Sequence, residues 1–103
     1  MADQEMFIAR LSALGQRSRL MIVELLLRAG EDGVSAGDIA ARTQIPRPTV
    51  SIHLAVLLRA GLVRSARKKQ SIFYSAEPPA IREMMAELGG LLGLGGGSLE
   101  SAA

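Results

Sequence analysis

The stretch over residues 45–62 constrains the fold most, because it combines a polar face with a long apolar face in a helical pattern. Val50, Leu54 and Leu57 are spaced i, i+4 and i+7, which places them on one stripe of an α-helix. Prolines near its start suit the first turn of a helix, and a glycine near its end suits the residue just past the last turn. We therefore predict a helix over residues 46–60 with its apolar stripe facing a core.

The opposite face of this helix carries side chains that suit a nucleic acid. Arg47, Thr49 and Ser51 place a guanidinium and two hydroxyls beside the positive end of the helix dipole, a combination that base edges and phosphates accept. An ordinary solvated amphipathic helix shows the same pattern. This stretch alone therefore leaves both interpretations open.

A shorter helix is predicted immediately before it. Ser35 and Asp38 have the spacing of a capping box, which indicates a helix over residues 36–42. Residues 43–45 are long enough only for a tight turn, and two helices joined by a turn of about three to four residues form a helix-turn-helix. This arrangement favours DNA binding.

The charges are divided along the chain in a way that agrees with this hypothesis. Residues 39–76 hold seven of the 12 basic residues and none of the 10 acidic ones, so this block carries +7 and the remainder −5. A basic block in an otherwise acidic chain is typical of a polyanion site, although a solvated basic face is the alternative. Because the block spans the candidate recognition helix, its position favours nucleic acid.

The remaining elements complete a winged helix-turn-helix. Residues 3–14 and 17–30 are predicted to form two further helices. The second has Leu20, Val23 and Leu27 in line, Ile22 and Leu26 beside them, and a glycine as its C-cap. Strand-like segments on either side of a basic tip predict a hairpin. The tip lacks the Gly or Asn that a tight turn prefers, so we expect a longer loop.

The predicted fold is mainly α, with five helices and a two-stranded wing. The last helix begins at the two prolines at 78 and 79 and runs to residue 88, after which glycines make order less favourable. We expect one domain over residues 1–94 and a flexible Gly/Ser-rich tail over residues 95–103. With 49% apolar residues in a chain of 103, one core completed by a partner subunit is expected.

Composition excludes several classes of function. The chain has no cysteine, which rules out disulfides, thiolate metal sites and thiol redox switches. No apolar run approaches the roughly 20 residues of a membrane span, and the N-terminus is acidic and amphipathic, so we expect a cytoplasmic protein without membrane contact. No carboxylate pair, activated nucleophile or phosphate-binding glycine loop indicates an enzyme.

Three stretches, LGQRSRLMIVELL, SAGDIAARTQIPRPTVSIHLAVLLRAGLV and RSARKKQSIFYSAE, together resemble the ArsR/SmtB family of prokaryotic repressors over residues 11–88. The resemblance implies a homodimer that pairs through its first and last helices, binds double-stranded DNA and usually leaves it when an inducer binds. Pairing of this kind is isologous, so the operator should be an inverted repeat.

The resemblance also assigns candidate site residues. Those of the recognition helix are Arg47, Pro48, Thr49, Ser51, Ile52 and His53. Those of the wing are Arg64, Arg67, Lys68 and Lys69. Those of the dimer interface are Met6, Phe7, Leu11, Ile81, Met84, Met85 and Leu88. In the recognition helix, Arg47 could form a bidentate contact to guanine. Ile52 either contacts a thymine methyl group or is an apolar side chain that is tolerated at the surface.

The sequence lacks the side chains that a metal-sensing site would need. His53 is the only histidine, and one imidazole does not make a site, so we expect a hydrogen-bonded structural imidazole or a phosphate contact there. The family's thiolate motif aligns with Ser35 and Gly37, and a cysteine pair found near the C-terminus of some members aligns with LGGLLGLGGG. The family's last-helix metal site aligns with Pro78, Ala80, Leu91 and Leu94. We expect neither a metal nor a cofactor.

Two functions from different classes remain. The first is a sequence-specific dimeric repressor whose inducer is either a small organic molecule held at the dimer interface, where methionines and leucines gather, or nothing at all. The alternative is a protein-interaction module that kept the winged-helix fold without specific operator binding. The acid-free basic block speaks against this alternative, because a surface freed from DNA has no reason to exclude acids.

Overall fold

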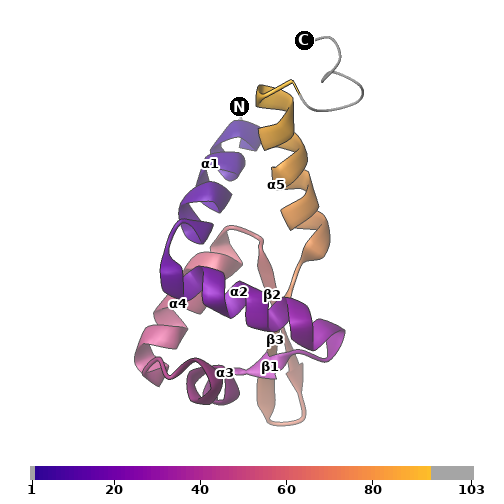
Figure 1. The fold of residues 1–103 in the computed structure, drawn as a ribbon. Coiled ribbons are helices and arrows are strands. Elements are labelled where there is room, and N and C mark those ends of the chain that lie inside the picture. The colour runs from indigo at the N-terminus through magenta and orange to yellow at the C-terminus, as the bar shows by residue number, and fades with distance from the viewer. Residues whose placement is uncertain (1, 94–103) are drawn as a thin grey trace.

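The structure, a computed structural model, describes residues 2–93 and shows five α-helices, one short 3₁₀ helix and three strands within them (Figure 1). In chain order these are α1 (Ala2–Leu14), α2 (Arg17–Ala29), the 3₁₀ turn η1 (Gly30–Asp32), β1 (Val34–Ser35), α3 (Ala36–Thr43), α4 (Arg47–Arg59), β2 (Val63–Lys68), β3 (Ser71–Ala76) and α5 (Pro78–Leu91). The predicted winged helix-turn-helix with five helices is confirmed. The expected tail over residues 95–103 lies outside the described residues.

The helix-turn-helix of α3 and α4 forms for local reasons. The Ser35 hydroxyl accepts a hydrogen bond from the backbone N–H of Asp38 at 3.1 Å, which caps α3 as predicted. Gln44 ends α3 in the left-handed region at φ 63°, and its N–H donates to the Ala40 carbonyl at 2.8 Å. The chain thereby reverses within the short turn and enters α4, whose first turn contains Pro48.

The wing is a hairpin of β2 and β3 with a tighter tip than the sequence predicts. Lys68 pairs with Ser71, which leaves only Lys69 and Gln70 in the loop. Lys69 supplies the positive φ that a two-residue turn needs, at 59°. The expectation of a longer loop is therefore wrong, because a lysine takes the conformation that glycine or asparagine usually provides.

A third strand, which the sequence analysis did not predict, completes the sheet. The two-residue strand β1 pairs antiparallel with β3 through Val34 with Tyr74 and Ser35 with Phe73, which gives the strand order β1-β3-β2. Two residues are too few for a period-2 pattern, so only the tertiary pairing reveals them. The strand joins the wing to the start of α3.

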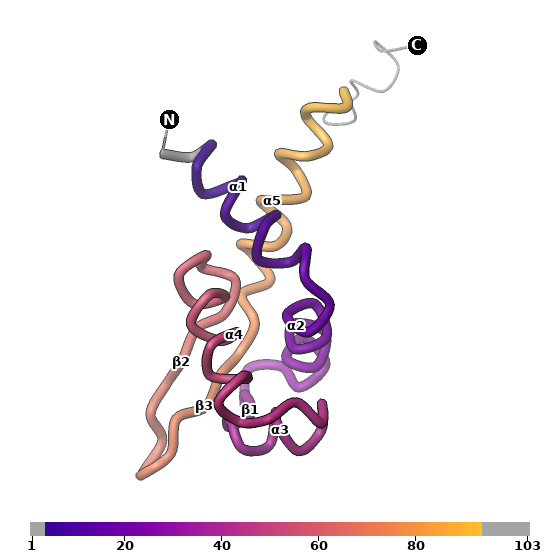
Figure 2. Tube along the Cα trace, turned by 90° about the vertical axis from the view of Figure 1, so that its left-hand side faces the viewer, coloured from indigo at the N-terminus to yellow at the C-terminus, as the bar shows by residue number. Residues whose placement is uncertain are grey.

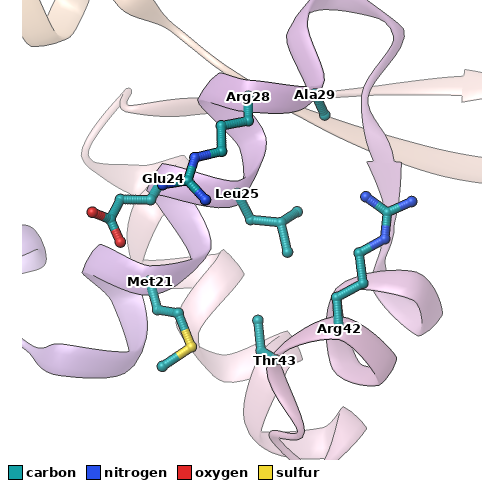
Figure 3. Close-up of a pocket in the computed structure, with 7 residues that line it drawn as sticks. All are labelled: Met21, Glu24, Leu25, Arg28, Ala29, Arg42 and Thr43. Carbon is teal, nitrogen blue, oxygen red and sulfur yellow. The ribbon is translucent and has the colours of Figure 1, made fainter.

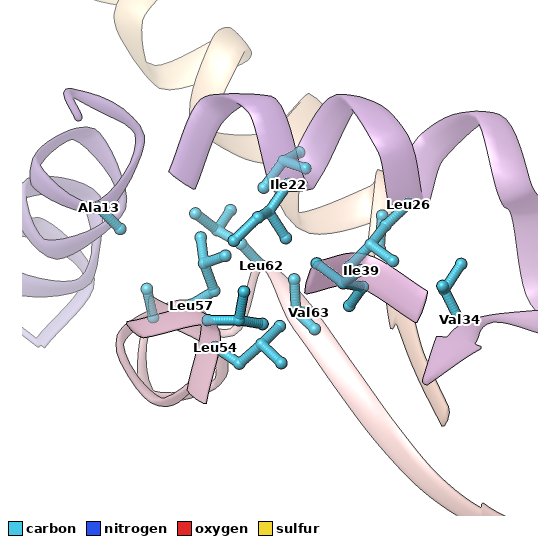
Figure 4. Close-up of a cluster of buried hydrophobic side chains, with 13 residues drawn as sticks. Ala13, Ile22, Leu26, Val34, Ile39, Leu54, Leu57, Leu62 and Val63 are labelled. Carbon is cyan, nitrogen blue, oxygen red and sulfur yellow. The ribbon is translucent and has the colours of Figure 1, made fainter. Parts of the chain in front are cut away.

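The core lies between α2, the helix-turn-helix and the sheet (Figure 4). Its largest fully buried side chains are Ile22, Leu26, Ile39, Val50, Leu54, Leu57 and Leu62. The predicted inward stripe of α4 is thus confirmed. In α2 the buried residues are Ile22, Val23 and Leu26, which all belong to the predicted apolar face. Leu20 and Leu27 are 47% and 44% exposed, so the prediction is wrong for these two.

Helices α1 and α5 lie against each other and project from the end of the molecule opposite the wing tip (Figures 1 and 2). This projection makes the molecule elongated, with extents of 52 × 25 × 22 Å. Helix α5 continues through Gly89 and Gly90 to Leu91, three residues past its predicted end. Within residues 2–93, no helix is long and apolar enough to cross a membrane.

Candidate nucleic-acid interface

The outer face of α4 is open to solvent and contains most of the predicted recognition residues. Pro48, Ser51 and Ile52 are exposed, with Ile52 at 65%, while Thr49 is half-buried. Because Val50, Leu54 and Leu57 anchor the other side of the helix in the core, this face is rigidly supported. A ligand that approaches this face therefore meets uncharged side chains, those of Pro48, Ser51 and Ile52.

Arg47 lies at the start of α4 with its guanidinium beside α3. A Cβ added at Gly37 would lie 3.9 Å from Arg47 Nη1, so the side chain lies next to the first turn of α3 without touching its backbone tightly. No hydrogen bond or ion pair occupies it among the described residues. Its five donors are therefore available to a base edge or a phosphate.

His53 is held by a hydrogen bond inside the protein. Its Nδ1 lies 3.3 Å from Nη1 of Arg19, and since a guanidinium only donates, Nδ1 accepts and the proton of the neutral ring lies on Nε2. Arg19 is itself anchored, because its Nε donates to the Ala13 carbonyl at 2.6 Å. The hydrogen-bonded structural role expected for His53 agrees with this geometry.

The same surroundings lower the pKa of His53. Burial of the half-exposed ring disfavours its charged form, and the positive charge of Arg19 adds to this effect. The imidazole is therefore neutral near pH 7, with Nε2–H as a donor. A phosphate contact through Nε2 remains a prediction.

The four predicted wing residues fall into two groups. Arg64 forms an ion pair with Glu77 at 2.9 Å, and the ammonium of Lys68 donates to the Asp32 carbonyl at 3.0 Å and lies 5.4 Å from the ring centre of Phe73. Arg67 and Lys69 are exposed, and neither has a hydrogen-bond or ion-pair partner within residues 2–93. Arg67 and Lys69 are thus the wing cations most available to an anion.

Two further exposed arginines extend the basic surface beyond the predicted set. Arg59 lies on the outer face of α4, in its last turn, and Arg42 lies in the last turn of α3. Both belong to the acid-free block, and this membership was the signal that could have included them. Arg19 gave no such signal, because its contact to His53 spans 34 residues of sequence.

The predicted dimer residues differ in how much of each is exposed in the single chain. Met6, Leu11, Met85 and Leu88 are exposed at 38%, 38%, 62% and 43%. Phe7 and Met84 are buried within the chain, and Ile81 is half-buried against the core. Ile8, which belongs to the apolar face predicted for the first helix, is exposed at 57%. Leu91 and Leu92, which were not predicted, are exposed at 73% and 64% and enlarge the apolar surface at the C-terminal end of α5.

The structure offers no metal cluster in the part of the chain that it describes. No group of three or more His, Cys, Asp or Glu side chains comes together there. Ser35, Gly37, Pro78, Ala80 and Leu91 stand at positions where the family resemblance would place ligands, and none has a side chain that binds transition metals well. Leu94 lies outside the described residues.

A depression of about 430 Å³ lies between α2 and α3 (Figure 3). It is lined by Met21, Glu24, Leu25, Arg28, Ala29, Arg42 and Thr43. The methionines expected to line an inducer pocket lie elsewhere. Met84 is buried, and Met6 lines a separate depression of about 300 Å³ with Arg10, Glu83 and Glu87.

Comparisons with known proteins agree with this geometry. A family model described as a helix-turn-helix domain matches residues 14–66. The HTH-type transcriptional regulator YgaV of Escherichia coli is 34% identical over 84% of this chain and 86% of its own length. An ArsR-like transcriptional regulator from Rhodococcus superposes with a TM-score of 0.79 at 25% identity, covering 88% of this chain and 83% of that one. The homodimeric winged helix-turn-helix DNA-binding domain of Mb0332 from Mycobacterium bovis, described as a possible ArsR-family regulator, superposes with a TM-score of 0.72 at 25% identity, covering 82% and 76%.

Proposed function

This chain belongs to the ArsR/SmtB family of winged helix-turn-helix transcriptional regulators, and from that premise we propose that it is a homodimeric repressor of an inverted-repeat operator that does not respond to metal ions. The observation that carries the proposal is the exposed outer face of α4. The opposite side of this helix is buried in the core, and the helix lies within the acid-free block of residues 39–76, which carries a charge of +7. A DNA major groove admits such a helix, and a basic block without acids attracts the phosphates on either side of the groove.

The proposed contacts divide into those that read bases and those that hold phosphates. Arg47 and Ile52 are the base-reading residues, through guanine O6 and N7 and a thymine methyl respectively, with Pro48, Thr49 and Ser51 beside them. Arg67 and Lys69 hold phosphates from the wing, and the Nε2–H of His53 donates to another. Arg64 and Lys68 contribute mainly by positioning the wing, since each already has a partner within the chain.

The homodimer is proposed from the apolar surface of α1 and α5. Met6, Leu11, Met85 and Leu88 are exposed on two helices that project together from the molecule, and burying them in an isologous contact removes them from water. The homodimeric structural relative from Mycobacterium bovis supports the same assembly. A dimer seated on an operator blocks access to that DNA, which makes repression the direct outcome. The protein acts in the cytoplasm, on DNA there.

The inducer is either a small organic molecule bound at the dimer interface or absent. Metal and metalloid ions are proposed to have no effect, because the aligned ligand positions hold Ser35, Gly37, Pro78 and Ala80 in place of thiolates, carboxylates and imidazoles. Loss of DNA binding on adding Zn²⁺ or arsenite would contradict this part of the proposal.

The test is a gel-shift titration on DNA from upstream of the protein's own gene, repeated at several salt concentrations and against random DNA. Specific binding with a steep salt dependence is expected. Arg47→Ala should relax discrimination at one base pair, at a cost of about 1–3 kcal/mol, because a bidentate contact is lost. Lys69→Ala should weaken all sequences alike and lower the slope of log K against log salt by about one.

Arg82→Ala is the matched control, because it removes an equal charge from an exposed position on α5, away from the proposed DNA contacts on α4 and the wing. It should leave both the discrimination and the salt slope close to those of the wild type. Equal binding of specific and random DNA at physiological salt would instead support the alternative, a protein-interaction module that kept this fold.

A further inference from the structure

Arg10 connects three helices that are distant in sequence. It lies in α1, and its Nε donates to the carbonyl of Ala60, the residue that caps the C-terminal end of α4, at 2.9 Å. Its Nη1 donates to Glu83 of α5 at 2.6 Å. The side chain of Arg10 is only 12% exposed, whereas that of Glu83 is 67% exposed, so the bond to Ala60 is better shielded from water than the ion pair. Among the described residues, it is the one side chain that bonds α1 both to α5 and to the end of α4.

The chemistry of this junction suits a stiff connection. The carbonyl of Ala60 stands at the negative end of the α4 dipole, where a guanidinium is attracted, and Ala60 is itself buried at 3% exposure. Gly61 follows with φ 73°, and a Cβ built there would lie 3.2 Å from Arg10 Nη2. The turn that leaves the recognition helix therefore passes directly against the guanidinium.

The position of this junction gives it a consequence for DNA recognition. Helices α1 and α5 project from the molecule and carry the proposed dimer contact, whereas α4 carries the proposed base contacts (Figures 1 and 2). The angle between these two parts decides how far apart the two recognition helices of a dimer lie. Half-sites of such dimers are read about one helical turn of DNA apart, so that distance decides which operators fit.

We propose that Arg10 is a positioning residue for operator recognition, which holds the end of α4 against α1 and α5 and thereby sets the half-site spacing that the dimer accepts. The inference rests on the proposed homodimeric, operator-binding function. It adds a determinant of specificity that touches no DNA. Without the guanidinium, the recognition helices move more freely relative to the dimer contact, and operators with altered spacing are tolerated.

The first test compares operators with natural spacing and with one base pair inserted between the half-sites. The wild type should prefer the natural spacing by about tenfold, because an insertion displaces one recognition helix from its bases. Arg10→Met keeps much of the side-chain length and removes every donor, and it should reduce that preference to about threefold or less. Glu83→Gln removes only the ion pair and should reduce the preference less. Arg82→Met is the control for charge loss on the same helices.

The ratio between the two operators separates positioning from stability. A variant that merely unfolds in part loses active protein, which weakens binding to both operators by the same factor and leaves the ratio unchanged. An unchanged ratio in Arg10→Met would therefore overturn the proposal.

A second measurement decides the role of Arg10 without DNA. The chain has no cysteine, so Ala55→Cys on the exposed face of α4 gives a single site for a spin label. The distance distribution between the two labels of a dimer should be narrow with Arg10 and broad in Arg10→Met. Equal widths would overturn the proposal. If the wild type binds random DNA as tightly as an operator, the proposed function fails, and the widths still decide whether Arg10 positions α4.

Discussion

At the scale of single residues, contacts decide which charged side chains remain available to a ligand. Arg64, Arg67, Lys68 and Lys69 are equivalent as sequence, yet Arg64 is paired with Glu77 and Lys68 with a backbone carbonyl. The energetic value of such an exposed ion pair is small, commonly below about 1 kcal/mol. Its effect is orientation, because a side chain held against its own protein loses the freedom to follow a phosphate.

His53 should make the free energy of unfolding depend on pH. Its pKa is lowered in the folded protein, by burial and then by Arg19, so the unfolded chain binds its proton more readily than the native state does. The free energy of unfolding should therefore fall as the pH drops below the ordinary value of about 6.5. His53→Gln, which keeps an acceptor for Arg19, should show a smaller fall. Urea denaturation between about pH 7.5 and 5.5 measures the difference between the two proteins.

The difference between the wild type and His53→Gln can be assigned to His53, because the chain contains one histidine and no second imidazole titrates in this pH range. Arg19→Met provides the control, since it removes the second cause and should return the pKa of His53 part of the way. Identical pH dependence in the wild type and His53→Gln would contradict the assignment.

At the scale of elements, turn geometry explains how short segments hold the sheet to the helices. The 3₁₀ turn begins at Gly30 and is followed by Gly33, with φ of 75° and 79°. The two differ in their surroundings: a Cβ at Gly33 would lie 2.9 Å from both Tyr74 O and Ser75 Oγ, whereas a Cβ at Gly30 would meet nothing within 4 Å. Gly33 is therefore required for the approach of this turn to β3, and Gly30 only for its own conformation.

The expected outcome is an unequal cost of two matched substitutions. Gly30→Ala should lower the free energy of unfolding by about 1–3 kcal/mol, from backbone strain alone. Gly33→Ala should cost clearly more, because the new methyl group also collides with a backbone oxygen that cannot move away cheaply. Denaturant midpoints of the two variants measure this difference, and equal midpoints would show that β1 and β3 separate easily.

At the scale of the whole molecule, the exposed apolar side chains of α1 and α5 predict assembly. Met85 is 62% exposed on α5 and lies on the proposed dimer face. Met85→Glu places a charge in that contact and should raise the dissociation constant of the dimer by about tenfold or more, since each factor of ten corresponds to about 1.4 kcal/mol. Sedimentation velocity over a range of concentrations measures the shift.

The control for this prediction is Ile72→Glu on the wing, where an exposed apolar side chain lies on β3, at the other end of the molecule. It should leave the dimer intact. A dimer that resists Met85→Glu but dissociates with Ile72→Glu would place the contact on the wing instead.

The sequence by itself determined the five helices, the two strands of the wing and the kind of surface that they present. Periodicity, the capping pair of Ser35 and Asp38 and the short turn before α4 are local signals, because each acts over a few residues. The acid-free block and the absence of cysteine are matters of composition, which folding does not change. These signals predicted the winged helix-turn-helix and the inward stripe of α4.

Only the tertiary structure decided which residues pair across the fold. Arg10 reaches a carbonyl 50 residues away and a carboxylate 73 residues away, and β1 joins β3 through two residues that have no pattern of their own. Phe7 and Met84 are likewise buried within the chain, although their sequence neighbours Met6 and Met85, predicted for the same interface, are exposed. The physical reason is common to all of them: such contacts depend on how packed helices are placed relative to one another, and local periodicity contains no information on that placement.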